Sequence, residues 1–115
     1  MWDVEYYKKE NGDCPVLEFL LGLDKKQRAK ADRQIELLAE EGIYLREPYA
    51  KHFSGPLWEL RVRFASDIQR IFYFAPDGNR FVLLHGFIKT TQKTPAREIK
   101  KAQAYYNDYQ RRAQQ

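Results

Sequence analysis

The sequence predicts an α+β domain in which the elements follow the order β-α-α-β-β-β-α. Residues 15–41 and 95–113 repeat apolar side chains every three to four positions, as amphipathic helices do. Residues 57–88 hold three apolar runs of strand length, and a strong hairpin signal joins the last two. We therefore expect a small sheet dominated by antiparallel strands, with an N-terminal helical hairpin and a C-terminal helix.

The first part of the chain predicts one strand and the helical hairpin. Trp2–Lys8 alternates apolar and polar side chains, as a strand does. Pro15 follows a turn signal and suits the first position of a short helix. Asp24, with Gln27 three residues later, resembles a capping box that opens a second helix. Gly42 suits the C-terminal end of that helix.

Residues 43–56 are predicted to form a loop, because they contain two prolines and a Ser-Gly pair. We then expect three strands, at about 57–64, 68–75 and 80–88. Residues 76–79 read Pro-Asp-Gly-Asn and join the last two strands as a hairpin. Thr94-Pro95 is predicted to cap the C-terminal helix.

Composition indicates a single domain over residues 1–115. Hydrophobic residues make up 43% of the chain and aromatic residues 15%, which is enough for a packed core. The one cysteine, Cys14, excludes an intramolecular disulfide and fits a reducing cytoplasm. Residues 1–10 are charged and lack an apolar stretch, so we expect no signal peptide. The sequence has no run of about 18 or more apolar residues, so we expect no membrane span.

The positive charge lies in the second half of the chain. Residues 1–50 contain eight Lys and Arg against eleven Asp and Glu, whereas residues 51–115 contain twelve against five. Because the cations coincide with the predicted strands, this distribution is typical of a nucleic-acid-binding surface. The alternative is an ordinary solvated surface with a chance excess of cations.

Strand alternation identifies the cations that share a face. Glu59, Arg61 and Arg63 have one parity, and an arginine is expected to pair with Glu59. Arg70 shares its face with large apolar residues, where a charge is costly unless it reaches water or a partner. Arg70 is therefore the strongest candidate, and the alternative role is a buried salt bridge to Glu59 or Asp67.

Lysines and aromatic residues extend this candidate surface. Lys89 ends the third apolar run, and Lys93 lies just before a helix whose first N–H groups favour anions. Both could instead be plain surface lysines. Four aromatic residues near the basic loop could stack on bases or fill a core: Tyr44, Tyr49, Phe53 and Trp58.

Other chemistries find little support in the sequence. The chain has no zinc-like spacing of His and Cys, no glycine-rich phosphate loop, no GxSxG and no HExxH. Its acidic residues cluster in the helical half and read as solvated faces, so a metal–carboxylate nuclease is not expected. His85, among large apolar residues, is expected to be a core histidine.

Four motifs in order resemble the RelE/HigB toxins of type II toxin–antitoxin systems, and more narrowly their phage-derived Gp49-like branch. They are NGxxPVxEFL, LWELR, RIFYF and LLHGFIKTTQKTP, followed by a terminal helix. The resemblance covers nearly the whole chain. It implies a compact RelE-like fold and a cognate antitoxin as partner, often of the helix-turn-helix type.

The resemblance also implies a ribosome-dependent endoribonuclease that cuts mRNA without a metal or other cofactor. In such toxins the 2′-hydroxyl attacks the adjacent phosphate, and cations stabilise the charge that develops. The resemblance carries the catalytic role to Arg61, Arg70, Lys89 and Lys93. It carries RNA contacts to Lys51, Arg63 and Tyr73, of which Tyr73 is also a candidate for proton transfer, as is Lys89 if neighbouring cations lower its pKa.

Two positions depart from the family pattern. No tyrosine follows the basic segment at Lys93, where some relatives carry one, and Thr90 stands where many have a second lysine. Two other functions therefore stay open. The chain could be a ParE-like toxin that inhibits a protein such as DNA gyrase, or a phage adaptor that binds RNA or protein without catalysis.

Overall fold

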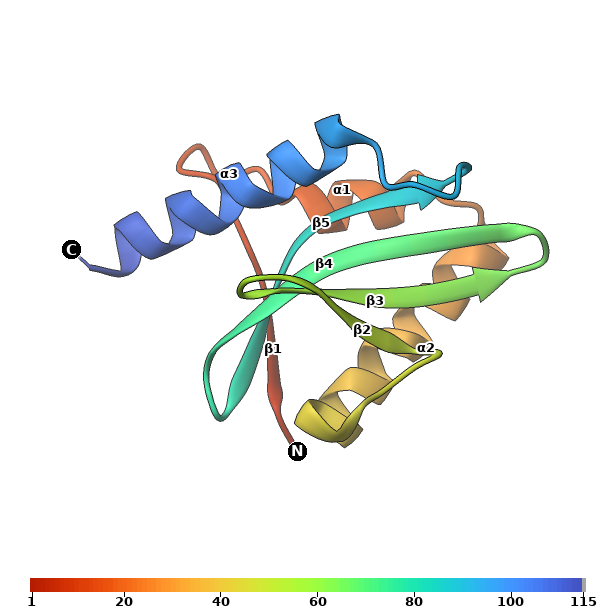
Figure 1. The fold of residues 1–115 in the computed structure, drawn as a ribbon, viewed down its shortest axis with the longest axis horizontal. Coiled ribbons are helices and arrows are strands. Elements are labelled where there is room, and N and C mark those ends of the chain that lie inside the picture. Colours follow the sequence, from red (N-terminus) through yellow and green to blue (C-terminus); the bar gives the residue numbers. More distant parts are fainter. Residues whose placement is uncertain (115) are drawn as a thin grey trace.

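The computed structural model describes residues 1–114 and confirms the α+β class (Figure 1). Its helices are α1 (Pro15–Leu21), α2 (Lys25–Glu41), the short 3₁₀ helix η1 (Gly42–Tyr44) and α3 (Ala96–Ala113). Its strands are β1 (Asp3–Tyr6), β2 (Ala50–Ser54), β3 (Leu57–Phe64), β4 (Asp67–Asp77) and β5 (Arg80–Lys89). The predicted helical hairpin, three-strand segment and C-terminal helix are all present.

Within the described residues, the strands form one five-stranded sheet in the order β1-β5-β4-β3-β2. β2, β3, β4 and β5 pair as antiparallel neighbours. β1 instead lies parallel to β5, with Val4 opposite Phe81. The predicted dominance of antiparallel pairing is confirmed, and the parallel pair brings the first strand of the chain beside the last.

The predicted loop over residues 43–56 is wrong in its last part, because Ala50–Ser54 forms the edge strand β2. Lys51 pairs with Glu59 of β3 in an antiparallel register. Gly55 turns the chain between the two strands with φ +52°, in the left-handed region that glycine tolerates. β2 is short and lacks regular apolar alternation, so its sequence carries little strand signal.

Both predicted ends of α2 are confirmed. The Asp24 side chain accepts a hydrogen bond of 2.8 Å from the Gln27 N–H and opens the helix. Gly42 ends it with φ +57°, and a Cβ at this position would lie 2.2 Å from the Trp2 ring. Only glycine therefore allows the chain to leave α2 while Trp2 packs against its end.

The prediction that Thr94 caps the C-terminal helix is wrong. α3 begins at Ala96, and Pro95 occupies the N-cap position with extended backbone and no side-chain cap. Thr94 is one residue too early in the chain to act as the cap, and it is buried. Proline is compatible with this start because its fixed φ matches the position before the first helical residue.

Helices cover the two faces of the sheet unequally. α1 and α2 pack on one face, over a core that includes Leu38 and Leu60. α3 packs on the other face, over a core that includes Phe74, Leu84 and Ala102. In Figure 1, α3 runs along β5, whereas the ends of β3 and β4 that meet in the hairpin extend away from it. The α3 face is therefore left uncovered at that end of the sheet.

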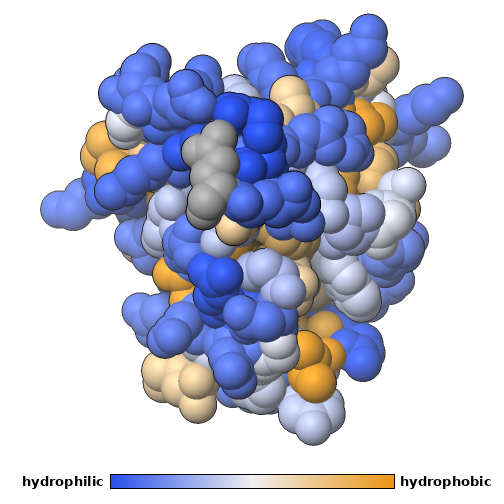
Figure 2. Space-filling model, turned by 90° about the vertical axis from the view of Figure 1, so that its left-hand side faces the viewer, coloured by the Kyte–Doolittle hydropathy of each residue, from blue (hydrophilic) through white to orange (hydrophobic). Residues whose placement is uncertain are grey.

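The end of the molecule at which α3 ends is mostly hydrophilic, with apolar residues in separate patches (Figure 2). There Arg111 and Arg112 form ion pairs with Asp108 at 2.6 and 2.8 Å. Cys14 is a buried free thiol. Among residues 1–114, no helix combines the length and hydropathy that a bilayer crossing requires.

Candidate nucleic-acid interface

Three neighbouring strands bring the predicted cations to the uncovered part of the α3 face. Arg61 of β3 lies directly opposite Arg70 of β4. One row further towards the hairpin, Arg63 lies opposite Ile68, and Ile68 lies opposite Lys89 of β5. Side chains in such adjacent rows of one sheet face are within reach of one another. The pairing register thus assembles cations that are far apart in the sequence.

A buried carboxylate lies among these cations. Glu59 is 4% exposed and Arg70 6% exposed. Arg61 Nη2 lies 3.7 Å from Glu59 Oε1, and Arg70 Nε lies 3.9 Å from Glu59 Oε2. Both distances are too long for a hydrogen bond. We refer to Glu59, Arg61, Arg70 and Lys89 as the cation cluster.

The cation cluster retains unused hydrogen-bonding capacity. Glu59 Oε2, Arg61 Nε and Arg70 Nε are buried and have no hydrogen-bond partner within the described part of the chain. Buried polar atoms in folded proteins are nearly always paired, so three unpaired atoms in one cluster need a reason. An anion with several acceptor oxygens would supply partners for the guanidinium donors.

Burial and mutual repulsion shift the pKa values in the cluster. Desolvation lowers the pKa of Arg70, the Arg61 charge lowers it further, and Glu59 opposes both effects. Desolvation also lowers the pKa of the half-buried Lys89, followed by the charge of Arg70, with Glu59 again in opposition. Arg70 stays protonated because guanidinium does not lose its proton in proteins. The site is therefore electropositive and partly desolvated.

A cleft of about 280 Å³ adjoins the cluster at the free edge of β3. Arg61, Arg63 and Arg70 line it, together with residues that the sequence did not single out as a site: Lys30 and Gln34 of α2, Pro48, and Ile68. Tyr49 also lines it and is 45% exposed, as a stacking role would require. Within residues 1–114, the Gln34 amide oxygen is buried without a hydrogen-bond partner. The sequence signal for this residue is its polar side chain between Ala31 and Ile35, which belong to the apolar stripe of α2.

The other predicted site residues lie at different distances from the cluster. Lys51 is exposed on β2, ion-paired with Glu47 at 4.0 Å, and its charge contributes to the lowered pKa of Lys89. Arg63 is exposed, and its charge acts on Arg70. Lys93 lies exposed in the loop before α3, where its carbonyl accepts a hydrogen bond of 2.7 Å from Thr91 Oγ1.

Tyr73 does not join the cations, so its predicted place beside the RNA is wrong. It belongs to the core under α1 and α2, on the opposite face of the sheet from Arg70, and is 3% exposed. Burial raises the pKa of its hydroxyl well above the usual range. The alternation along β4 puts odd and even positions on opposite faces, and this already separates Tyr73 from Arg70.

His85 lies in the core, as the sequence predicts. His85 is buried, and its Nε2 lies 2.8 Å from Glu98 Oε1 of α3. Burial lowers the pKa of His85, against the opposing effect of Glu98. His85 is thus a satisfied core histidine. Within residues 1–114, no group of three or more His, Cys, Asp or Glu side chains is placed to hold a metal ion.

Comparison with protein families places the chain in a family. The family described as phage-derived protein Gp49-like (DUF891) matches residues 18–107, which is more than half of the chain. The matched segment includes α2, the whole sheet except β1, and most of α3. It therefore contains every residue of the cation cluster. No curated protein sequence matches the chain.

Proposed function

Because the chain belongs to the Gp49-like family of phage-derived proteins, which is part of the RelE/HigB-type toxin group, we propose that it is a toxin that cuts mRNA on the ribosome. It acts in the cytoplasm of a bacterial cell, where a cognate antitoxin of the helix-turn-helix type neutralises it. The observation that carries the proposal is the cation cluster. Two arginines meet on an uncovered sheet face, and the Nε–H of each lacks a partner within residues 1–114.

The proposed reaction is an internal phosphoryl transfer in the RNA backbone. The 2′-oxygen forms a bond to the adjacent phosphorus, and the bond from phosphorus to the 5′-oxygen of the next nucleotide breaks. The 2′-hydroxyl loses its proton to solvent water, and the departing 5′-oxygen gains a proton from Lys89. The products are a 2′,3′-cyclic phosphate and a 5′-hydroxyl. Negative charge accumulates on the non-bridging oxygens on the way, and fixed cations lower the barrier by stabilising it.

Arg61 and Arg70 are suited to hold the reacting phosphate. A guanidinium can donate two parallel hydrogen bonds to one phosphate and cannot act as a base, so its role is binding and charge stabilisation. Arg70 is anchored within β4 and buried, so its position is largely set before the substrate arrives. The Nε atoms of both arginines lack partners within residues 1–114, so the guanidinium groups keep donor capacity for a phosphate.

Lys89 is suited to donate the proton that the 5′-oxygen gains. Desolvation and the neighbouring charges of Arg70 and Arg61 lower its pKa, and a lower pKa makes the ammonium group a stronger acid. Lys51, Arg63 and Lys93 are exposed and flank the cluster on three segments. Their proposed role is to attract and position the RNA backbone, as surface cations do in other RNA-binding proteins.

Glu59 is proposed as a positioning residue. Its carboxylate lies between the two guanidinium groups at distances just beyond hydrogen bonding. Without it, Arg61 and Arg70 would face each other as like charges in adjacent strands, a destabilising arrangement. Because the contacts are long, a phosphate can take over the donors without breaking strong hydrogen bonds to Glu59.

The test is induction of the chain in a bacterial host, with primer extension on abundant messages. We expect in-frame cuts that disappear in an Arg70→Ala, Lys89→Ala double variant. The matched control is Arg97→Ala, Lys100→Ala, which removes the same charge from exposed positions of α3 and should leave the cuts in place. Growth arrest without cuts, equal in both variants, would favour a protein target such as DNA gyrase. Neither arrest nor cuts would favour a non-catalytic adaptor.

A further inference from the structure

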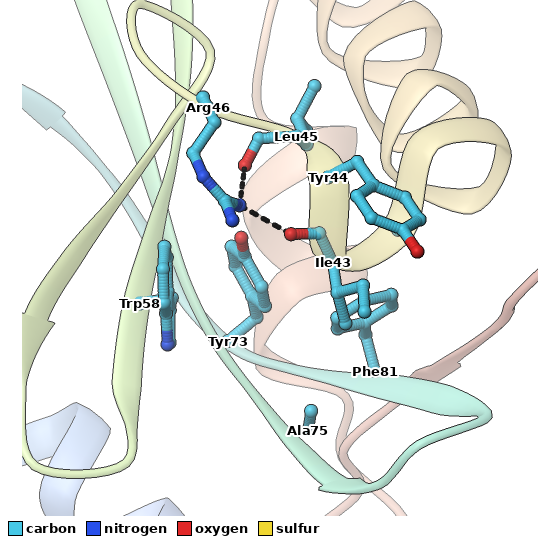
Figure 3. A pocket seen from close by; sticks show the side chains of 9 residues that line it. Ile43, Tyr44, Leu45, Arg46, Trp58, Tyr73, Ala75 and Phe81 are labelled. Atoms are coloured by element: carbon cyan, nitrogen blue, oxygen red, sulfur yellow. Dashed lines mark hydrogen bonds between the residues drawn. The ribbon is translucent and has the colours of Figure 1, made fainter.

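A second pocket lies on the sheet face opposite the cation cluster (Figure 3). It has a volume of about 300 Å³ and lies where η1 meets the sheet. Its main lining residues are Ile43, Leu45, Arg46, Trp58, Tyr73 and Phe81. We refer to it as the η1 pocket. Because Tyr73 and Arg70 lie on opposite faces of β4, a molecule in the η1 pocket does not occupy the proposed RNA surface.

Two polar groups converge in this otherwise apolar pocket. The Tyr73 ring is buried, and in Figure 3 its hydroxyl points towards the Arg46 guanidinium. No hydrogen bond to that hydroxyl is formed within residues 1–114, whereas Trp58 and Phe81 supply apolar walls. The hydroxyl faces the pocket, where a ligand oxygen can accept its hydrogen bond.

The Arg46 charge is also uncompensated within the described residues. Its Nη1 donates to the carbonyl oxygens of Ile43 and Leu45, the latter at 3.2 Å, and no carboxylate lies within 4.0 Å of the guanidinium. The charge of Arg46 reaches Tyr73, because it lowers the pKa of the hydroxyl that burial raises. A cation and a phenol donor at one end of an apolar pocket are complementary to a carboxylate on an apolar body.

The rim of the pocket favours a protein over a free small molecule. Ile43 is 52% exposed and Tyr44 70% exposed beside the opening. Exposed apolar side chains around a pocket are typical of a protein contact in which one anchor side chain is buried and its neighbours exclude water. A volume of about 300 Å³ suits one or two side chains.

We propose that the η1 pocket docks an acidic segment of the antitoxin. An aromatic or aliphatic side chain of that segment fills the apolar part, and a carboxylate next to it binds Arg46 and accepts a hydrogen bond from the Tyr73 hydroxyl. This inference depends on the proposed function, because it takes the partner to be an antitoxin. Neutralisation through this pocket would leave the cation cluster physically open and act from the other face of the sheet.

The experiment measures the affinity of the purified chain for the product of the reading frame beside its gene, by titration calorimetry. We expect Arg46→Glu to weaken binding about tenfold or more, because it sets two negative charges against each other. Tyr73→Phe keeps the ring and its packing and should weaken binding about three- to tenfold. The control Lys26→Glu reverses an exposed charge at the other end of α2 and should leave the affinity unchanged.

The outcomes separate this inference from the proposed function. Loss of affinity in both pocket variants and not in the control supports docking in the η1 pocket. Unchanged affinity in either pocket variant, or an equal loss in Lys26→Glu, overturns it. Quenching of Trp58 fluorescence by phenylacetate, with antitoxin affinity unchanged in the variants, would assign the pocket to a small acid instead. No binding by the unmodified chain would overturn the toxin–antitoxin assignment as well.

Discussion

Two clusters in this molecule each place a carboxylate between two arginines, but they differ in how the charges pair. The first is the cation cluster, in which the contacts between Glu59 and its arginines are 3.7 and 3.9 Å long and lack hydrogen bonds. The second, which we name the α3 anchor, consists of Tyr7, Asp108, Arg111 and Arg112. There the Tyr7 hydroxyl donates to Asp108 at 2.6 Å, and Arg111 and Arg112 donate to the same carboxylate at 2.6 and 2.8 Å.

The two clusters differ in how completely their charged groups pair with one another. In the α3 anchor the charges satisfy one another and tie the end of the C-terminal helix to the segment after β1. In the cation cluster the charges are more deeply buried, and two guanidinium donors lack a partner within residues 1–114. Internal pairing would have been the more stable arrangement, and we propose that a ligand supplies the missing acceptors.

The largest expected effect is the loss of cleavage in Arg70→Ala. This change removes a fixed donor to the phosphate, and we expect the rate to fall by about 10²- to 10³-fold, as after loss of other charge-stabilising donors. Arg112→Ala in the α3 anchor should leave the rate unchanged. Single-turnover cleavage on programmed ribosomes measures both. Equal losses in the two variants would contradict the division between the clusters.

Glu59→Gln should have the next largest effect, on stability. The amide keeps the shape but leaves Arg61 and Arg70 without a negative neighbour, and we expect a loss of about 3 kcal/mol in the free energy of unfolding. Inorganic phosphate should restore part of this loss, because it supplies the missing negative charge. Denaturant titration with and without phosphate provides the measurement. A variant as stable as the parent chain would show that Glu59 does not hold the arginines together.

The α3 anchor should show a different dependence on pH. The hydrogen bond from Tyr7, followed by those from the arginines, lowers the pKa of Asp108 to about 2. A carboxyl group with a depressed pKa stabilises the fold above its unfolded pKa of about 3.9, and this contribution is lost as the pH falls towards 2. We expect Asp108→Asn to remove that part of the acid dependence and to leave cleavage at neutral pH unaffected. Circular dichroism across this range tests it.

The smallest expected effects concern the pKa of Lys89. After desolvation, the charge of Arg70 is the largest cause that lowers it, and Lys51 contributes least. Arg70→Met should therefore raise the Lys89 pKa clearly and Lys51→Ala only slightly, whereas Arg112→Met should not change it. Since only protonated Lys89 can donate a proton, activity should fall with rising pH earlier than an ordinary lysine pKa of about 10.4 would give. Proton NMR titration of the Lys89 ammonium group measures its pKa in each variant and shows whether the shifts follow this order.

Much of the fold follows from the sequence because local signals and tertiary packing agree. The strand predicted at 57–64 has those bounds in the structure, and Asp24 and Gly42 mark the two ends of α2 as predicted. β2 was missed because an edge strand held by a single partner needs little apolar pattern of its own. The only sequence feature that points to β2 is Gly55, which forms the turn after it, and from sequence alone a glycine indicates only an interruption of regular structure.

The candidate site was predictable in its residue types and less so in its geometry. The alternation of side chains within a strand predicts which residues share a face with Arg61 in β3 and with Arg70 in β4. It does not predict that the two arginines lie opposite each other, because this depends on the register between the strands. The same register made Glu59 a buried member of the cluster, although the sequence indicated only that it would pair with an arginine. Tyr73 has the chemistry of a proton donor, but the alternation along β4 puts it on the face opposite Arg70, and it lines the η1 pocket.

The most direct measurement is analysis of the RNA ends produced by the purified chain on ribosomes programmed with a defined message. We expect products that carry a 2′,3′-cyclic phosphate and a 5′-hydroxyl. We also expect no cleavage where a single 2′-deoxynucleotide replaces the residue before the cut, and none by the Arg70→Ala, Lys89→Ala variant. Cleavage that persists without the 2′-hydroxyl, or that persists in the double variant, would contradict the claim that the cation cluster drives attack by the 2′-oxygen.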